Sequence, residues 1–266
     1  MRNGVKFAGI SDLLAAFKRY SLAGMLGWQD VRQRYRRSAL GPFWLTISMG
    51  VMIGTIGIVF GQIFKSPMKE FLPFLAAGLI LWSFISSLIL EGCSSFIVAE
   101  GIIKQLPIPL FVHIMRMIWR NFVILCHNLL IIPVVFLILG KPVNSLIFMS
   151  IPGFLLMTVN LAWLALILAI LCARYRDLPQ IIGSLLQVFF YVTPIVWMPN
   201  LLPERSAMYL LNTNPFYHLI EIVRLPLLGE MPSPLNWMVS FVSAVIGWTI
   251  ALIVFNRYRS RIAYWL

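Results

Sequence analysis

The chain reads FLPFLAAGLILWSFISSLIL from Phe71 to Leu90, 20 residues without a single charged side chain. An α-helix of about 20 residues spans roughly 30 Å, the thickness of the hydrocarbon core of a membrane. A helix satisfies its own backbone hydrogen bonds, which lipid cannot do. The stretch is therefore typical of a membrane-spanning helix.

Five further stretches are also free of Asp, Glu, Lys and Arg and long enough to cross a membrane. The six are Ser38–Phe64, Phe71–Leu90, Asn121–Gly140, Pro142–Ala173, Leu178–Pro203 and Met231–Asn256. The chain of 266 residues is 60% hydrophobic and 11% charged, whereas soluble domains are about 45–50% apolar and about 25% charged. We therefore predict an all-α membrane protein with six transmembrane helices.

The basic residues predict the orientation of these spans. Sixteen of the 21 Lys and Arg residues fall in the N-terminal 37 residues, the loops after the second and fourth spans and the C-terminal tail. Because cytoplasmic segments carry the excess of positive charge, both termini are predicted to be cytoplasmic. We divide the chain into a cytoplasmic N-terminus (1–37), a six-helix transmembrane domain (38–256) and a cytoplasmic tail (257–266).

Two segments outside the spans have a helical pattern of their own. Residues 11–28 place Leu14, Phe17, Met25 and other apolar side chains every three or four positions. This spacing predicts an amphipathic helix in the cytoplasmic interface, which either anchors the topology or grips a partner or substrate.

The uncharged run Ser206–Ile220 is too short to cross a membrane and contains two asparagines, a proline and a histidine. We predict a re-entrant or interfacial segment on the external side, between spans five and six. Just after it, Glu221 and Arg224 stand three residues apart and can pair on one face of a helix.

The loop from Glu91 to Arg120 is the longest that we expect on the cytoplasmic side. Its first part, Gly92–Ala99, can form a short helix bracketed by Glu91 and Glu100. A short helix with acidic ends can dock a soluble partner, although a simple solvated loop fits the same pattern. The residues predicted to couple this chain to a partner are Glu91, Ser94, Ser95 and Glu100.

The sequence contains no GxxxxGK[ST] loop, no HExxH and no GxSxG motif. Its three cysteines, Cys93, Cys126 and Cys172, have no metal-ligand spacing. His127 lies within a predicted span, either as packing or as a proton relay or ligand. We therefore expect no catalytic residue, metal or cofactor in this chain. The energy for any transport is expected from a separate nucleotide-hydrolysing subunit.

Three motifs resemble one family of membrane proteins. They are WQDVRQRYRRSALGPFW at Trp28–Trp44, RYRDL at Arg174–Leu178 with the aromatic run that follows it, and NPFY at Asn214–Tyr217. In this order they resemble type-2 ABC permeases that export polysaccharides, above all those for lipid-linked O-antigen. Many members carry a proline near the position of Met49, and this chain does not.

The resemblance implies a homodimer of this subunit with two copies of an ATPase subunit, which binds ATP and Mg. It also implies a polyprenyl-diphosphate-linked polysaccharide as cargo, moved from cytoplasm to periplasm across the bacterial inner membrane. ATP-driven closure of the partner subunits would push the helix near 92–99 and open a channel between spans one and five. Gly50, Gly54, Gly57 and Gly61 of span one fit close helix approach in a dimer.

Aromatic side chains near the ends of spans one and five and in the re-entrant segment are candidates for the glycan pathway, although aromatic belts occur in most membrane proteins. They are Phe43, Trp44, Phe189, Phe190, Tyr191, Trp197, Phe216 and Tyr217. A basic cluster can meet a lipid diphosphate or simply anionic headgroups. It consists of Arg32, Arg34, Arg36 and Arg37. The rival functions are an integral-membrane enzyme and an ion-coupled carrier acting on lipid-linked sugars.

Overall fold

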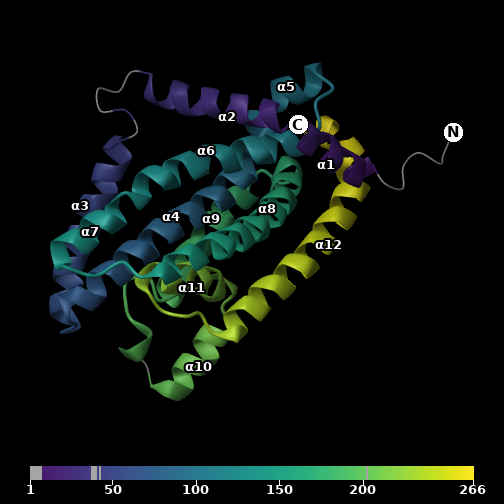
Figure 1. The fold of residues 1–266 in the computed structure, drawn as a ribbon. Helices are drawn as coiled ribbons and strands as arrows, with labels where there is room; N and C mark the ends of the chain where they lie inside the picture. Colours follow the sequence, from purple (N-terminus) through teal and green to yellow (C-terminus); the bar gives the residue numbers. More distant parts are fainter. Residues whose placement is uncertain (1–7, 37–40, 42, 202) are drawn as a thin grey trace.

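The computed structural model describes residues 8–36, 41, 43–201 and 203–266, and every regular element in this part of the chain is a helix (Figure 1). The prediction of an all-α protein is confirmed. Five helical segments are long and apolar enough to cross a membrane. They are Phe43–Ile63 (α3), Met68–Val98 (α4), Phe111–Leu139 (α6, Phe111–Leu129, with α7, Ile131–Leu139), Ser145–Arg174 (η1, Ser145–Met149, with α8, Ser150–Arg174) and Pro234–Trp265 (α12).

The remaining predicted span, Leu178–Pro203, is helical only over Leu178–Val192 (α9). Fifteen residues of helix reach only about 22 Å. The helix ends at Thr193, which is extended, because the proline that follows disfavours a helical conformation for the residue before it. A short 3₁₀ turn, Pro199–Leu201 (η2), comes next. A sixth membrane span therefore stays a prediction.

Helix α9 nevertheless has neighbours at both ends of the bundle. Arg176 donates to the carbonyl of Trp265 at 3.5 Å, so the turn before α9 lies beside the end of α12. Asn214 donates from Nδ2 to Oγ1 of Thr193 at 2.8 Å, so the far end of α9 lies beside α11 (Pro215–Leu228). In Figure 1 the described ends of the chain, at α1 and the end of α12, lie at one end of the bundle and α10 (Glu204–Asn212) at the other.

The prediction of a long loop from Glu91 to Arg120 is wrong, because both ends of this segment are helical. Helix α4 continues to Val98 and α6 begins at Phe111, so the predicted helix Gly92–Ala99 is mostly the last turns of α4. The reason is burial: Cys93 and Phe96 are fully buried. The separate short helix is instead Glu100–Gln105 (α5).

Helix α12 likewise continues past the predicted end of its span. It runs nine residues beyond Asn256, through all but the last residue of the predicted tail, and ends at Trp265. Phe255 and Ile262 are both fully buried. Because residues seven apart lie on the same face of a helix, the face that packs in the membrane span continues into the tail.

Helices α4 and α8 form the centre of the bundle, and α11 packs against both of them and against α12. Most of α4 is buried. The backbones of α8 and α11 approach closely at Gly153 of α8, where an added Cβ would lie 2.1 Å from the carbonyl oxygen of Ile222 in α11. Of the predicted re-entrant segment, residues 218–220 on α11 are therefore packed among other helices, whereas Tyr209 and Leu210 on α10 are exposed. Its depth in a membrane stays a prediction.

The predicted N-terminal helix is two helices, α1 (Ala8–Lys18) and α2 (Tyr20–Tyr35), and α2 lies across the end of the bundle (Figure 1). Their buried face is made of small residues such as Ala16, Ala23 and Gly27. The apolar side chains of the predicted stripe, including Phe17 and Trp28, are instead exposed. An interfacial position, with these side chains in lipid, stays a prediction.

Gly153→Ala is expected to push α11 away from α8, because the new methyl group meets backbone that cannot rotate aside. Overpacking of this kind costs about 1–3 kcal/mol. The unfolding temperature of the detergent-solubilised protein should fall. The matched control is Gly24→Ala in α2, where no heavy atom of the described residues lies within 4 Å of the added Cβ. An equal response of the two variants would contradict the close packing.

Candidate functional site

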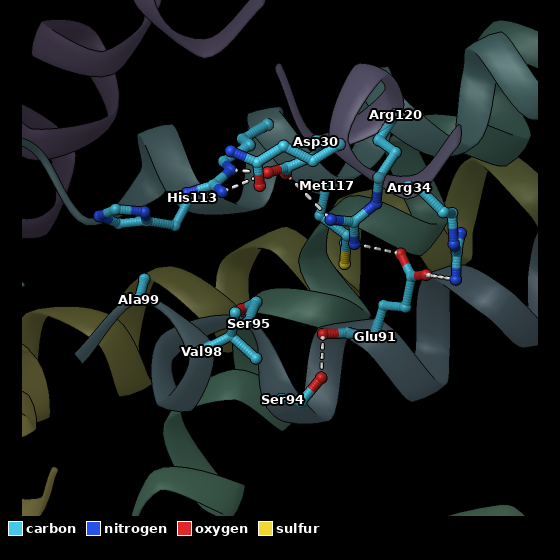
Figure 2. Close-up of a pocket in the computed structure, with 12 residues that line it drawn as sticks. Asp30, Arg34, Glu91, Ser94, Ser95, Val98, Ala99, His113, Met117 and Arg120 are labelled. Carbon is cyan, nitrogen blue, oxygen red and sulfur yellow. Dashed lines mark hydrogen bonds and ion pairs between the residues drawn. The ribbon is translucent and has the colours of Figure 1, made fainter. Parts of the chain in front are cut away.

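Charged side chains from three helices meet at the end of the bundle that holds the termini, forming the α2–α4–α6 ion cluster (Figure 2). Its members are Asp30, Arg34, Glu91, Arg116 and Arg120. Asp30 of α2 accepts from Nε of Arg116 at 2.6 Å and from Nη1 of Arg120 at 3.0 Å. Arg116 and Arg120 are four residues apart on α6, so both point to the same side of that helix.

Arg120 joins two helices through one guanidinium group. Its Nη2 donates to Oε2 of Glu91 on α4 at 2.6 Å, while Nη1 holds Asp30 on α2. Asn121 also donates to Oε2 of Glu91, and Nη2 of Arg34 lies 3.8 Å from the other oxygen. Figure 2 shows Arg120 between the two carboxylates. Glu91, which was predicted to couple the chain to a partner, therefore forms its ion pair and hydrogen bonds within the chain.

A cavity of about 370 Å³ lies beside the cluster, between the last turns of α4 and the start of α6. Ser94 and Ser95 line it, together with His113. The hydroxyl of Ser94 donates to the carbonyl of Glu91 at 3.2 Å. The hydroxyl of Ser95 and both ring nitrogens of His113 are buried without a hydrogen-bond partner. The structure thus brings three of the four predicted coupling residues together around one cavity.

Glu100, the fourth, lies away from the cavity on α5. Its carboxylate accepts from Nζ of Lys104 at 2.6 Å, and this hydrogen bond with the charge of Lys104 lowers the pKa of Glu100. Both side chains are exposed to a similar degree, 40% and 45%. The two charges therefore face solvent, where a second protein can reach them.

A second carboxylate ties the ends of the chain together. Asp12 of α1 accepts from the backbone N–H groups of Leu110 (3.1 Å) and Phe111 (3.0 Å), which cap the start of α6. Nε of Arg259 on α12 donates to the same carboxylate at 2.8 Å. The Asp12 side chain is fully buried. Nothing local in the sequence marks this role, because its partners are 98 or more residues away.

Two residues of the predicted basic cluster, Arg32 and Arg34, lie on α2, and Arg36 follows the last residue of that helix. All three are exposed, and Arg34 reaches Glu91. Arg37 lies outside the described residues. Because these guanidinium groups are exposed, they can reach a lipid diphosphate or anionic headgroups, and this role stays a prediction.

The predicted aromatic residues divide into two groups. The rings of Phe190 and Phe216 pack against Trp82 of α4, with centroids 5.9 and 5.7 Å from it, and Phe189 packs on Phe216 at 5.0 Å. We call this the Trp82 cluster. Tyr191 lies next to this cluster, with its ring centroid 5.3 Å from that of Phe190. Sequence reasoning missed Trp82 because it stands in the middle of a span.

The other predicted aromatic residues lie around or away from this cluster. Trp197 donates from its indole nitrogen to the carbonyl of Tyr191 at 3.0 Å, and the Tyr217 ring packs on His218. Phe43 of α3 packs instead on His127 of α6 with centroids 5.7 Å apart, and Trp44 is exposed.

The predicted pair on α11 is confirmed and buried. Arg224 is fully buried and forms an ion pair with Glu221. It also donates to the carbonyl of Pro194 at 2.7 Å, and its guanidinium carbon lies 3.8 Å from the centre of the Phe74 ring. The pair therefore fixes the segment after α9 against α11 and α4.

Residues 22–228 match the family described as ABC-2 type transporter. The chain belongs to this family. The matched range runs from α2 to α11 and includes both the α2–α4–α6 ion cluster and the Trp82 cluster. The family predicted from the three motifs is confirmed, and the protein is a multi-pass transporter membrane subunit.

Curated relatives carry a more specific name. The chain is 23% identical over 241 residues to an O-antigen export system permease protein RfbA of Klebsiella pneumoniae, covering 88% of this chain and 91% of that protein. It is 25% identical over 198 residues to the protein of the same name from Myxococcus xanthus, covering 72% and 74%. The similarity thus extends over most of both proteins.

Asp30→Asn is expected to loosen α2 from α6, because the amide carries no charge to hold the two arginines. A hydrogen bond to a charged group contributes about 1.5–3 kcal/mol, and the Asp30 side chain is only 11% exposed. Hydrogen exchange of the α2 backbone should become faster. The control is Glu100→Gln, the same change on an exposed carboxylate. Unchanged exchange in α2 would show that the cluster does not hold the helix.

Proposed function

We propose that this protein is the channel-forming subunit of an ATP-driven exporter. Its cargo is an O-antigen-like polysaccharide linked to polyprenyl diphosphate, moved from the cytoplasm to the periplasm across the bacterial inner membrane. The names of the curated relatives support the cargo. The observation that carries the mechanism is the α2–α4–α6 ion cluster, which fastens one end of the central helix α4 to two neighbours.

An ATPase subunit, with its bound ATP and Mg, would dock on the exposed segment between α4 and α6. Val98 is 75% exposed and Leu106 is 52% exposed, and the charged pair of Glu100 and Lys104 lies between them in sequence. Apolar side chains surrounded by charges are the usual composition of a protein contact. Because Glu91 is paired within the chain, we propose that the ATPase subunit contacts the turn at Val98 and α5 instead of Glu91.

Helix α4 would carry a push from this end toward the glycan route. Glu91 and Trp82 are nine residues apart on one unbroken helix, about 13 Å along its axis. A displacement at Glu91 therefore reaches the Trp82 cluster through rigid backbone. Aromatic faces and scattered hydrogen bonds suit a neutral sugar chain, and the exposed Arg32 and Arg36 suit its diphosphate.

A homodimer is supported by the faces that α3 leaves open. Within the chain, Gly57 and Gly61 pack against α4, because an added Cβ would lie 2.5 Å from Leu72 and 2.6 Å from Met68. Gly50 and Gly54 have no heavy atom within 4 Å of an added Cβ. These two glycines are therefore free for close approach of a second subunit.

Val98→Asp is expected to reduce co-purification of the ATPase subunit at least about tenfold, because a charge buried in an apolar contact is costly. In proteoliposomes the same variant should lose ATP-driven transfer of a lipid-linked glycan. The matched control is Val143→Asp, the same change on a residue that is 64% exposed in the loop after α7. Its activity should equal that of the parent.

Several results would contradict this proposal. If Val98→Asp binds the ATPase subunit as well as the parent does, the proposed docking surface is wrong, but the proposed exporter function still holds. Transport that persists without ATP and collapses with the proton gradient would favour the ion-coupled carrier. Turnover of a lipid-linked sugar by the purified subunit alone would favour the membrane enzyme.

Gly54→Leu is expected to weaken the dimer, because its side chain fills the space needed by the second α3. The dimeric fraction in chemical crosslinking of the membrane-embedded protein should fall severalfold. The control is Val59→Leu, on another face of α3 and 47% exposed. An undiminished dimer in Gly54→Leu would place the subunit contact elsewhere.

A further inference from the structure

A recess of about 440 Å³ lies between α3, α4 and α6, and it shares Arg34 and Glu91 with the cavity of the ion cluster. Its walls include polar side chains from all three helices. They are Ser48, Ser83, Ser87, Asn121 and Asn128. The volume far exceeds the roughly 30 Å³ that one water molecule occupies. It lies in the size range of ligand sites, about 300–1,000 Å³.

The recess extends along the helices into their apolar part. Ser83 precedes Glu91 by eight residues on α4, about 12 Å, and Asn128 follows Asn121 by seven residues on α6, about 10 Å. Polar groups at such positions in apolar helices are costly unless they have partners. Their convergence on one recess therefore calls for a polar occupant.

Two polar groups that line the recess have no hydrogen-bond partner among the residues that the structure describes. Asn128 is only 4% exposed, and its Oδ1 is one of them. It also lines a narrow inner pocket together with Ser83 and Ser87. The hydroxyl of Tyr35, at the end near α2, is likewise buried and unpartnered. Burial raises the pKa of Tyr35, so this hydroxyl stays protonated and can donate.

The lining identifies the chemistry of the occupant. Serine, asparagine and tyrosine side chains both donate and accept hydrogen bonds, as hydroxyl groups do. Arg34 at the same end has a side chain that is 50% exposed, which leaves room for an anion. Met49 and Met52 add an apolar wall that suits a hydrocarbon chain, and Met52 is exposed, so the recess is reached from the surface of α3.

We propose that the α3–α4–α6 recess binds the hydroxyl-rich head group of a membrane amphiphile, with the attached chain lying along α3. Two sources share this chemistry: a sugar carried on a lipid, and the glycerol head group of a phospholipid. The inference does not depend on the proposed function, because it concerns the subunit without a partner or ATP.

The test uses the full-length protein in nanodiscs of phosphatidylethanolamine and a photoreactive alkyl glucoside with a diazirine next to its head group. Crosslinked peptides from α3, α4 and α6 are quantified by mass spectrometry. Ser87→Ala and Asn128→Leu should each reduce labelling about fivefold, as expected for the loss of one buried hydrogen bond. The matched control is Ser86→Ala, since Ser86 bonds to the carbonyl of Trp82 and does not line the recess.

Competition distinguishes the sources. Displacement of the probe by unlabelled octyl glucoside alone identifies a sugar. Displacement by dioctanoyl phosphatidylglycerol as well identifies a site that also takes a glycerol head group. Equal displacement by dioctanoyl phosphatidylcholine, which has no free hydroxyl, would show that only the tail binds and overturn the proposal. Labelling of Ser87→Ala and Asn128→Leu at the level of the parent would also overturn it.

Discussion

The guanidinium group of Arg120 holds two carboxylates that belong to different helices, and the packing of the bundle end depends on it. It donates to Asp30 on α2 at 3.0 Å and to Glu91 on α4 at 2.6 Å, while Arg116 gives Asp30 a second partner. Partly buried charges are stable only when each is paired and hydrogen-bonded. The arrangement meets this condition and fixes α2 across the end of α4 and α6.

A second buried guanidinium group plays the same part at the opposite end. Arg224 joins α11 to the carbonyl of Pro194 and to the ring of Phe74 on α4. Helix α4 is therefore fastened at both ends by charged groups and buried along most of its length. The helices with open faces, α3 and α9, lie around this fixed centre.

The sequence predicted the helical class and most of the span positions, because charge-free stretches mark lipid-facing helices. The ends of α4 and α12 were predicted too early and the start of α6 too late, because the predicted spans stop at the nearest charged residue. Glu91 and Arg120 lie within these helices and pair with each other, 29 positions apart, and no local pattern reveals such pairing. Ser94 and Ser95 were predicted near a partner site and do line a cavity. Trp82 gave no signal, because one more aromatic residue inside an apolar span is unremarkable in sequence.

The contact of Asp12 with Arg259 has a consequence for the order in which the molecule is assembled. The two residues are 247 positions apart, and the first four candidate spans and α9 lie between them. During synthesis, Asp12 can cap α6 as soon as that helix is made, but its charge stays without this cation until α12 is in place. The ion pair that fixes α1 against α12 therefore forms last, after all the other helices of the bundle have been made.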